Sequence, residues 1–273
     1  SLEELGLQPE ILAQFKEILQ RPHGILLVTG PTGCGKTTTL YAALRIINAI
    51  QKNVITLEDP VEYRIARIRQ SQVDVKSGLT FSNGLRSILR QDPDIILIGE
   101  IRDLETAEIA IHAALTGHLV FSTLHTNDAT AALTRLIDMG VEPFLVASSV
   151  VGILAQRLVR KVCQQCREPY PSTLELLKQL GLDSTKKITL YRPKGCEICK
   201  MTGYLGRTGL YEFMKTSDTL RDLVLQKGSS KVFREQAVRE GLVTLRRAGV
   251  AKLLEGVTTV EEVLRVTEQN LGE

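Results

Sequence analysis

Eight residues near the start of the chain have the types and the spacing of a phosphate-binding loop. Two glycines, Gly30 and Gly35, flank four residues, and Lys36 and Thr37 follow directly. Glycine lets backbone N–H groups turn toward a phosphate, Lys36 supplies a positive charge, and the Thr37 hydroxyl can ligate Mg²⁺. The alternative is a structural glycine turn. The residues expected to bind nucleotide are Gly30, Pro31, Thr32, Gly33, Cys34, Gly35, Lys36, Thr37 and Thr38.

Three further polar residues stand where predicted strands end. Glu58 follows the apolar run 54–57, Glu100 follows 94–98, and His125 follows 119–122. Because ligands bind beyond the carboxyl ends of parallel strands, we expect all three side chains at one edge of the sheet. Glu58 would orient or deprotonate water, Glu100 would hold Mg²⁺ through water, and His125 would sense the γ-phosphate. The alternatives are a plain polar strand end for Glu58 and a hydrogen-bonded structural histidine.

Four of the five cysteines form two Cys-x-x-Cys pairs, and the fifth, Cys34, lies in the loop. Two such pairs let two tight turns each present two thiolates, which together make a tetrahedral zinc site. Because no histidine or carboxylate joins them at ligand spacing, we expect a closed structural site rather than a catalytic one. Unliganded or redox-active thiols are the alternative. The predicted ligands are Cys163, Cys166, Cys196 and Cys199.

Strands and helices alternate from the loop onward, which predicts the fold. The run 24–29 predicts a strand entering the loop, and helices are expected over 38–50, 80–89, 103–116, 128–139 and 143–160. A Ser-x-x-Glu pattern at Ser1 predicts a cap for the first helix. Residues 61–79 look irregular, with a possible hairpin over 68–75. Ser172 is expected to cap a small helix between the cysteine pairs, and a short strand is expected near 209–213.

These elements predict an α/β fold with a RecA-like P-loop nucleotidase core, in which helices flank a parallel or mixed sheet. We expect a small tetracysteine zinc-binding insertion and a C-terminal helical lobe in addition. The predicted domains are the ATPase core at 1–158, the zinc-binding subdomain at 159–206 and the helical lobe at 207–273.

Composition excludes some function classes. The 273 residues carry a formal net charge of +3 and only 4% aromatic residues, and no basic stripe with interleaved aromatics is present. A nucleic-acid motor is therefore disfavoured. No apolar run approaches the roughly 18 to 20 residues of a membrane span, and no signal peptide opens the chain. We expect a cytosolic protein.

Several segments resemble the signature segments of secretion and pilus ATPases, and the resemblance runs essentially end to end. The four cysteines and the segment 206–212 are most similar to type II secretion assembly ATPases, and pilus-extension ATPases come second. Retraction ATPases of the same superfamily lack the cysteines. The segments that carry the resemblance are 30–41, 57–62, 89–94, 99–107 and 122–128.

The resemblance implies ATP and Mg²⁺ at the phosphate loop, Glu58 as the residue that positions the attacking water, Glu100 as the Walker B acid and His125 as the centre of the His box. It also implies a cytosolic homo-hexamer, peripheral at the inner membrane through its partners. There it would drive a membrane platform protein that adds subunits to a pilus-like fibre for protein secretion. No nucleic-acid partner is implied.

Two departures from the family pattern bear on activity. Cys34 stands where these proteins usually have Ser, and an accessible thiol there would be open to oxidation or alkylation. The domain that precedes this one in the family supplies arginines that reach the phosphates, and it is outside this sequence. We therefore expect weak hydrolysis by this chain alone. Arginines that could contact nucleotide across a subunit boundary are Arg86, Arg90, Arg102 and Arg135. A nucleotide-regulated scaffold with little intrinsic hydrolysis is the competing function.

Overall fold

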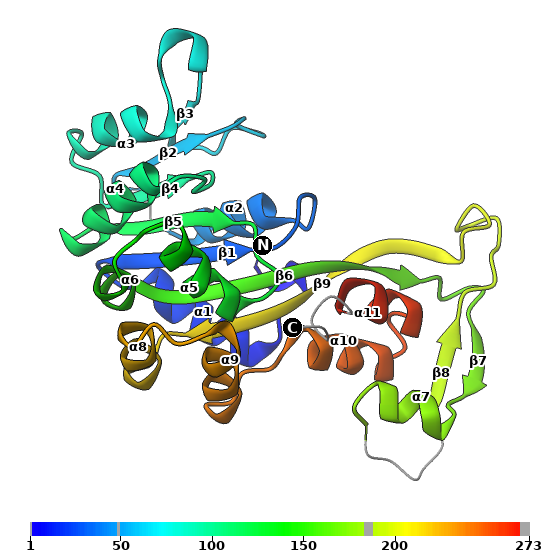
Figure 1. The fold of residues 1–273 in the computed structure, drawn as a ribbon. Coiled ribbons are helices and arrows are strands. Elements are labelled where there is room, and N and C mark those ends of the chain that lie inside the picture. Colours follow the sequence, from blue (N-terminus) through cyan, green and yellow to red (C-terminus); the bar gives the residue numbers. More distant parts are fainter. Residues whose placement is uncertain (1, 48–49, 183–187, 268–273) are drawn as a thin grey trace. The chain divides into compact units, whose positions relative to one another are not determined.

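The structure is a computed structural model that describes residues 2–47, 50–182 and 188–267. The chain divides into two compact units. The first unit comprises Ser1–Gln156 and Glu212–Leu242, and the second comprises Arg157–Tyr211 and Val243–Glu273. Figure 1 shows the path of the chain.

The largest sheet has the strand order β3-β2-β4-β5-β1-β6-β9 within the described residues. The pairs β3/β2, β2/β4, β4/β5, β5/β1 and β1/β6 are all parallel. A parallel sheet flanked by helices confirms the predicted α/β fold (Figure 1). The strands are β1 (Gly24–Thr29), β2 (Val54–Glu58), β3 (Arg69–Gln72), β4 (Ile95–Ile98), β5 (Leu119–Leu124), β6 (Val150–Val162) and β9 (Tyr204–Lys215).

Helices of the first unit cover this sheet, and three of them begin at the predicted places. Thr80, Asp103 and Asp128 each accept a hydrogen bond from a backbone N–H of the first helical turn, which satisfies a donor that has no partner inside the helix. Ser1 lies outside the described residues, as do 48–49 of the predicted helix 38–50. The helices are α1 (Pro9–Leu19), α2 (Lys36–Ile46), α3 (Phe81–Leu89), α4 (Leu104–Leu115), α5 (Ala129–Asp138), α6 (Pro143–Ser149), α8 (Asp218–Leu225) and α9 (Ser230–Arg239), with short 3₁₀ turns at Glu3–Leu5 and Val75–Ser77.

The predicted helix over 143–160 is wrong beyond Ser149, because strand β6 begins at Val150. The segment Val150–Ala155 is buried throughout and rich in branched residues, which suits a strand with neighbours on both sides. Within it, a Cβ added at Gly152 would lie 2.5 Å from Cδ1 of Ile18 on α1. A short apolar run has no period that separates a buried strand from a buried helix.

The predicted hairpin over 68–75 is also wrong. Residues 69–72 form β3, which pairs in parallel with β2, from Ile55 opposite Arg69 to Glu58 opposite Gln72. The only antiparallel feature nearby in the described residues is an isolated bridge between Asp74 and Leu79. The segment therefore extends the main sheet as an edge strand.

The second unit has its own apolar core around a two-stranded antiparallel sheet of β7 (Glu168–Pro171) and β8 (Thr189–Arg192). The helix α7 (Leu174–Gln179) is capped by Thr173, whereas the Ser172 hydroxyl accepts the N–H of Ile188 instead. The helices α10 (Leu245–Leu254) and α11 (Val260–Thr267) complete this unit. Its core residues are Leu180, Leu190, Val250, Leu253, Val260 and Val263.

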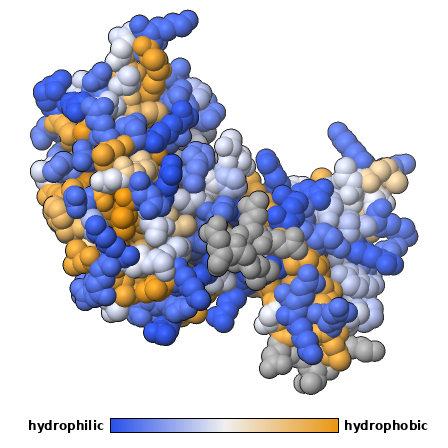
Figure 2. Space-filling view, in the orientation of Figure 1, coloured by the Kyte–Doolittle hydropathy of each residue, from blue (hydrophilic) through white to orange (hydrophobic). Residues whose placement is uncertain are grey.

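The two units divide the C-terminal helices, since α8 and α9 belong to the first unit and α10 and α11 to the second. The predicted domains at 1–158, 159–206 and 207–273 stay a prediction. On the face drawn in Figure 2, hydrophobic residues surface in several patches between hydrophilic ones. None of the helices in the described part of the chain is long and apolar enough to cross a membrane.

A buried carboxylate in the second unit gives this unit a testable pH dependence. Glu262 is 1% exposed, and its oxygens lie 2.9 Å from Arg160 Nη2 and 2.8 Å from Arg265 Nη2. It also accepts the backbone N–H of Arg160 at 2.7 Å. Burial alone would raise the pKa of Glu262, but these donors lower the pKa to about 2, from a usual 4.5.

Because the folded-state pKa lies below the unfolded one, Glu262 stabilises the second unit fully above pH 4.5. We expect that contribution, about 3 kcal/mol, to fade as the pH falls from 4.5 toward 2. The measurement is the free energy of unfolding against pH for the unsubstituted chain and for Glu262→Gln. The difference in free energy of unfolding between the unsubstituted chain and Glu262→Gln should shrink as the pH falls from 4.5 toward 2. Glu261→Gln, at the exposed neighbouring position, is the control and should leave stability nearly unchanged.

Candidate functional site

The phosphate loop leaves β1 and turns directly into helix α2. Gly33 and Gly35 have φ angles of 77° and 91°, a left-handed conformation that glycine adopts without strain. Gly35 is the N-terminal cap of α2, so Lys36 starts the helix. The Lys36 Nζ donates to the carbonyl oxygens of Gly30 at 2.8 Å and Pro31 at 3.1 Å. The loop therefore has the backbone turns and the helix start that anion binding requires.

The strand order places the predicted residues along one edge. The neighbours β2, β4, β5 and β1 are parallel, and their carboxyl ends carry Glu58, Glu100, His125 and the phosphate loop in that order. Gly99 lets the ends of β2 and β4 approach, because a Cβ at this position would lie only 3.3 Å from the Glu58 Cα. The fold thus brings the four features to the same edge of the sheet.

Glu100 and His125 are in contact. The His125 Nε2 lies 3.4 Å from one Glu100 oxygen, and Arg102 Nη2 lies 2.5 Å from the other. The Glu100 side chain is 12% exposed, whereas that of His125 is about half exposed and that of Arg102 is mostly exposed. The Glu100 carboxylate raises the pKa of the Arg102 guanidinium through a hydrogen bond and its charge. This carboxylate remains within reach of a ligand from the solvent side.

A pair of threonines joins the segment around His125 to the strand that enters the phosphate loop. The backbone N–H of Thr126 donates to the Thr29 hydroxyl oxygen at 2.9 Å, and the two hydroxyl oxygens lie 2.6 Å apart. Thr29 is the last residue of β1 and is fully buried. The position of His125 is therefore tied to the start of the loop.

Glu58 is enclosed by hydrogen-bond donors. Its carboxylate, 3% exposed, accepts the hydroxyls of Tyr41 and Thr56 and the Nε2 of Gln70 at 3.2 Å. Tyr41 belongs to α2, five residues beyond Lys36. Burial and the neighbouring Glu58 carboxylate raise the pKa of Tyr41, so this hydroxyl stays protonated and donates. The donors fix the direction of the carboxylate, and Glu58 does not contact solvent as freely as Glu100 does.

The remaining predictions around the loop have different outcomes. Cys34 is 4% exposed, so the accessibility that oxidation would need is absent. Arg102 contacts Glu100, whereas Arg86 pairs with Glu105 at 2.8 Å and Arg90 donates to the Ser87 hydroxyl. The proposed role of these arginines and Arg135 across a subunit boundary stays a prediction.

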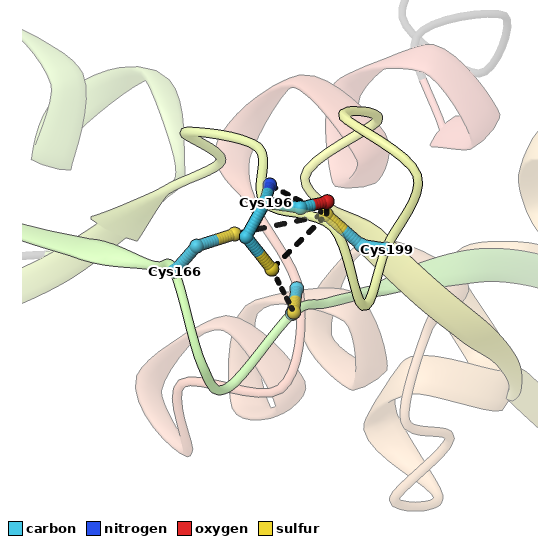
Figure 3. A group of neighbouring side chains, drawn as sticks. Cys166, Cys196 and Cys199 are labelled. Atoms are coloured by element: carbon cyan, nitrogen blue, oxygen red, sulfur yellow. Dashed lines mark hydrogen bonds between the residues drawn. The ribbon is translucent and has the colours of Figure 1, made fainter.

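The four downstream cysteines of the second unit converge, and their sulfurs all lie within 4.8 Å of one another. Figure 3 shows the side chains of Cys166, Cys196 and Cys199 directed at a common centre. A tetrahedral zinc with Zn–S distances of about 2.3 Å places its sulfurs about 3.8 Å apart. Three of the six Sγ separations are 3.7 Å for Cys196–Cys199, 3.8 Å for Cys166–Cys199 and 3.9 Å for Cys163–Cys196. The donor set therefore fits zinc.

Backbone N–H groups surround these sulfurs. Those of Cys196 and Gly203 each donate to the Cys199 Sγ at 3.2 Å, and that of Gly195 donates to the Cys166 Sγ at 3.3 Å. Burial would raise the pKa of Cys199, but the amides of Cys196 and Gly203, together with the thiols of Cys196 and Cys166, lower it to about 6. Such donors favour the thiolate form that binds metal and orient the ligands.

Sequence reasoning missed Tyr41, Gln70, Thr39 and Gln156. The first two enclose Glu58, and the side chain of Gln156 bonds both Thr39 and the phosphate loop. Gln70 and Gln156 lie in segments whose secondary structure was wrongly predicted. The sequence therefore did not indicate that these two side chains face the site. The position of Tyr41 on the predicted helix 38–50, which leaves the phosphate loop, could have suggested it.

Comparison with known proteins places the chain in a family of secretion system proteins. The family model described as type II/IV secretion system protein matches residues 1–265. The chain is 52% identical over 98% of its length to the type II secretion system protein E of Pseudomonas aeruginosa and 48% identical to the type II secretion system ATPase E of Vibrio cholerae. It is 49% identical over 97% of its length to the type IV pilus assembly ATPase PilB of Thermus thermophilus. It spans 53%, 53% and 30% of these relatives, respectively.

Solved structures agree with the fold. The pilus retraction motor PilT with bound ADP has a TM-score of 0.69 at 28% identity, and the match covers 97% of this chain and 66% of PilT. The Legionella pneumophila ATPase DotB has a TM-score of 0.71 at 22% identity, over 98% of this chain and 65% of DotB. The DotB match shows the fold alone. With its family model matched over nearly the whole sequence, this chain belongs to the type II/IV secretion system protein family.

Proposed function

We propose that this chain is the ATP-hydrolysing part of a cytoplasmic motor that powers assembly of a pilus-like fibre for type II secretion. One observation carries the proposal. In a chain of this family, three consecutive parallel strands on one side of the phosphate-loop strand, β5, β4 and β2, deliver His125, Glu100 and Glu58 to the edge where that loop begins. Phosphoryl transfer needs phosphate contacts, charge stabilisation and a positioned water, and this edge offers residues of each kind.

Each residue has a proposed role. The loop residues Gly30 to Thr38 hold the phosphates, and Lys36 leaves the loop carbonyls to pair with the β- and γ-phosphates. Glu58, held by its three donors, orients the attacking water. His125, beside Glu100, reports whether a γ-phosphate is present. Arg102 can exchange Glu100 for a phosphate because its side chain is mostly exposed.

Two metals belong to the proposal. Thr37 and Glu100 would hold Mg²⁺, which neutralises charge on the phosphates when it is bound. Cys163, Cys166, Cys196 and Cys199 would hold one structural Zn²⁺, and their nearly tetrahedral sulfur separations support this assignment.

The assembly is also a proposal, because the chain spans about half the length of the type II secretion relatives. We propose a homo-hexamer in the cytoplasm, peripheral at the inner membrane through its contacts with platform proteins, and without a nucleic-acid partner. The relatives named for type II secretion support this reading. The match to PilB favours the second candidate, a type IV pilus assembly ATPase. A nucleotide-regulated scaffold is the third.

Substitution of the acids tests the enzymatic role. In the full-length assembled protein, Glu58→Gln and Glu100→Gln should each lower ATP turnover by about a hundredfold or more while sparing nucleotide binding, since each removes a charge and little volume. Glu105→Gln, at an exposed carboxylate paired with Arg86, is the matched control and should keep normal turnover. Full activity in both acid variants would refute the assigned roles. A hydrolysis-dead variant that still supports secretion would favour the scaffold.

Turnover against protein concentration tests the assembly. If the site is completed within a ring, the rate per subunit should climb with concentration for the full-length protein and stay low for this chain. A high rate from this chain that does not depend on concentration would contradict the hexameric proposal.

A further inference from the structure

A buried glutamine stands beside the phosphate loop on the neighbouring strand. Strand β6 pairs with β1 up to the partners Ala155 and Thr29, which is the last residue of β1. Gln156 follows Ala155 and is 2% exposed. Its side chain is therefore level with the point at which the loop begins, on the side of β1 away from Glu58 and Glu100.

Both the nitrogen and the oxygen of the Gln156 side-chain amide form hydrogen bonds. The Nε2 donates to the backbone carbonyl of Cys34 at 2.7 Å, and the Oε1 accepts the Thr39 hydroxyl at 2.7 Å. Thr39 is fully buried in the first turn of α2. Around Cys34, the loop residues Pro31, Thr32 and Gly33 are exposed. The contact at Cys34 thus anchors a loop that is otherwise open to solvent.

The chemistry of the two partners requires an amide. The Cys34 carbonyl can only accept a hydrogen bond, and the Thr39 hydroxyl here donates. Glutamate at position 156 would set a carboxylate oxygen against the Cys34 carbonyl oxygen, and leucine would remove both of these hydrogen bonds. Burying an unpaired polar group costs more than the bond itself contributes.

The anchored carbonyl also sets the direction of an amide. The Cys34 carbonyl and the Gly35 N–H belong to one planar trans peptide group, in which the C=O and N–H bonds point in opposite directions. A carbonyl held toward Gln156 therefore directs the Gly35 N–H away from β6, to the other side of the loop. Backbone N–H groups aimed in this way are what a phosphate loop uses to bind its anion.

We propose that Gln156 is a positioning residue for the phosphate loop, which fixes the Cys34–Gly35 peptide so that the Gly35 N–H faces the phosphates of a bound nucleotide. The inference rests on the proposed nucleotide site and adds to it a residue on the opposite flank of β1. It predicts lower affinity for nucleotide in a chain that is still folded. A purely structural glutamine would affect stability alone.

The test uses Gln156→Glu, which keeps the shape and removes the donor, and Thr39→Val, which removes only the partner that orients the amide. ADP and a non-hydrolysable ATP analogue with Mg²⁺ are titrated against each folded variant by calorimetry. We expect Gln156→Glu to weaken both nucleotides at least about tenfold and by similar factors, because both carry phosphates held by the loop. Thr39→Val should weaken them less, and Thr39→Ser, which keeps the hydroxyl, should restore affinity. Gln91→Leu, at an exposed glutamine, is the control.

The outcomes separate this inference from the function on which it rests. Suppose that the unsubstituted chain binds nucleotide and that Lys36→Ala abolishes this binding. If Gln156→Glu and Thr39→Val then both bind nucleotide with normal affinity, the positioning role is wrong. If the unsubstituted chain binds no nucleotide, the proposed function fails first. Should Gln156→Glu not fold, unchanged affinity in folded Thr39→Val still overturns the inference.

Discussion

Lys36→Ala should weaken binding of ATP and ADP by about a thousandfold or more, because it removes the one loop side chain that brings a positive charge to the phosphates. The Lys36 Nζ already lies in the loop, 2.8 Å from the Gly30 oxygen and 3.1 Å from the Pro31 oxygen, so little ordering is needed when a phosphate replaces these carbonyls. The measurement is a calorimetric titration with each nucleotide and Mg²⁺.

Lys52→Ala is the matched control for this loss. Lys52 is half exposed, pairs loosely with Asp94 at 3.7 Å and precedes β2, so it lies at the opposite, amino-terminal edge of the sheet. Removing it changes the net charge by the same amount without touching the loop. Nucleotide affinity in Lys52→Ala should equal that of the unsubstituted chain. Equal losses in both variants would mean that long-range charge, rather than the phosphate loop, sets the affinity.

Much of the site was predictable because its residues follow apolar runs. A buried strand that ends in an acid needs only a local pattern, and the parallel order of the strands then brings the ends to one edge. For this reason the placement of Glu58, Glu100 and His125 at one edge of the sheet was predictable without any knowledge of tertiary contacts, whereas their roles stay a prediction. The contact of Glu100 with His125 depends on the order β4-β5, which adjacency along the chain makes the simplest choice, whereas Arg102 lies only two residues beyond Glu100.

The residues that hold the site in place were not predictable in the same way. Gln70 reaches Glu58 only because β3 pairs in parallel with β2, and residues 69–72 carry no apolar run. Gln156 reaches the loop only because β6 joins the sheet next to β1, although its sequence also suits a buried helix. In both cases the strand forms through long-range pairing rather than local preference. Buried polar residues that serve a loop or an acid are therefore missed until the sheet is known.

Removal of the cysteine cluster should unfold much of the second unit and leave the first one folded. A four-thiolate zinc site contributes on the order of 10 kcal/mol to local folding, more than a small core supplies. The second unit has such a small core, built from β8, α10, α11 and the end of α7. In Cys163→Ser with Cys166→Ser, hydrogen exchange should rise across residues 157–211, while the sheet around the phosphate loop stays protected.

Metal analysis and a control variant complete this test. The unsubstituted chain should carry about one zinc per molecule, as a closed four-cysteine site requires. Cys34→Ser makes the same atomic change at a buried cysteine of the first unit and should keep the zinc. Absence of zinc from the unsubstituted chain would refute the metal site. If zinc is present but its removal raises hydrogen exchange equally in both units, the ion stabilises the whole chain and not its second unit alone.

If only the second unit shows faster hydrogen exchange, nucleotide affinity in the double cysteine variant should remain normal. The reason is that the phosphate loop, Gln156 and the strand ends all belong to the first unit.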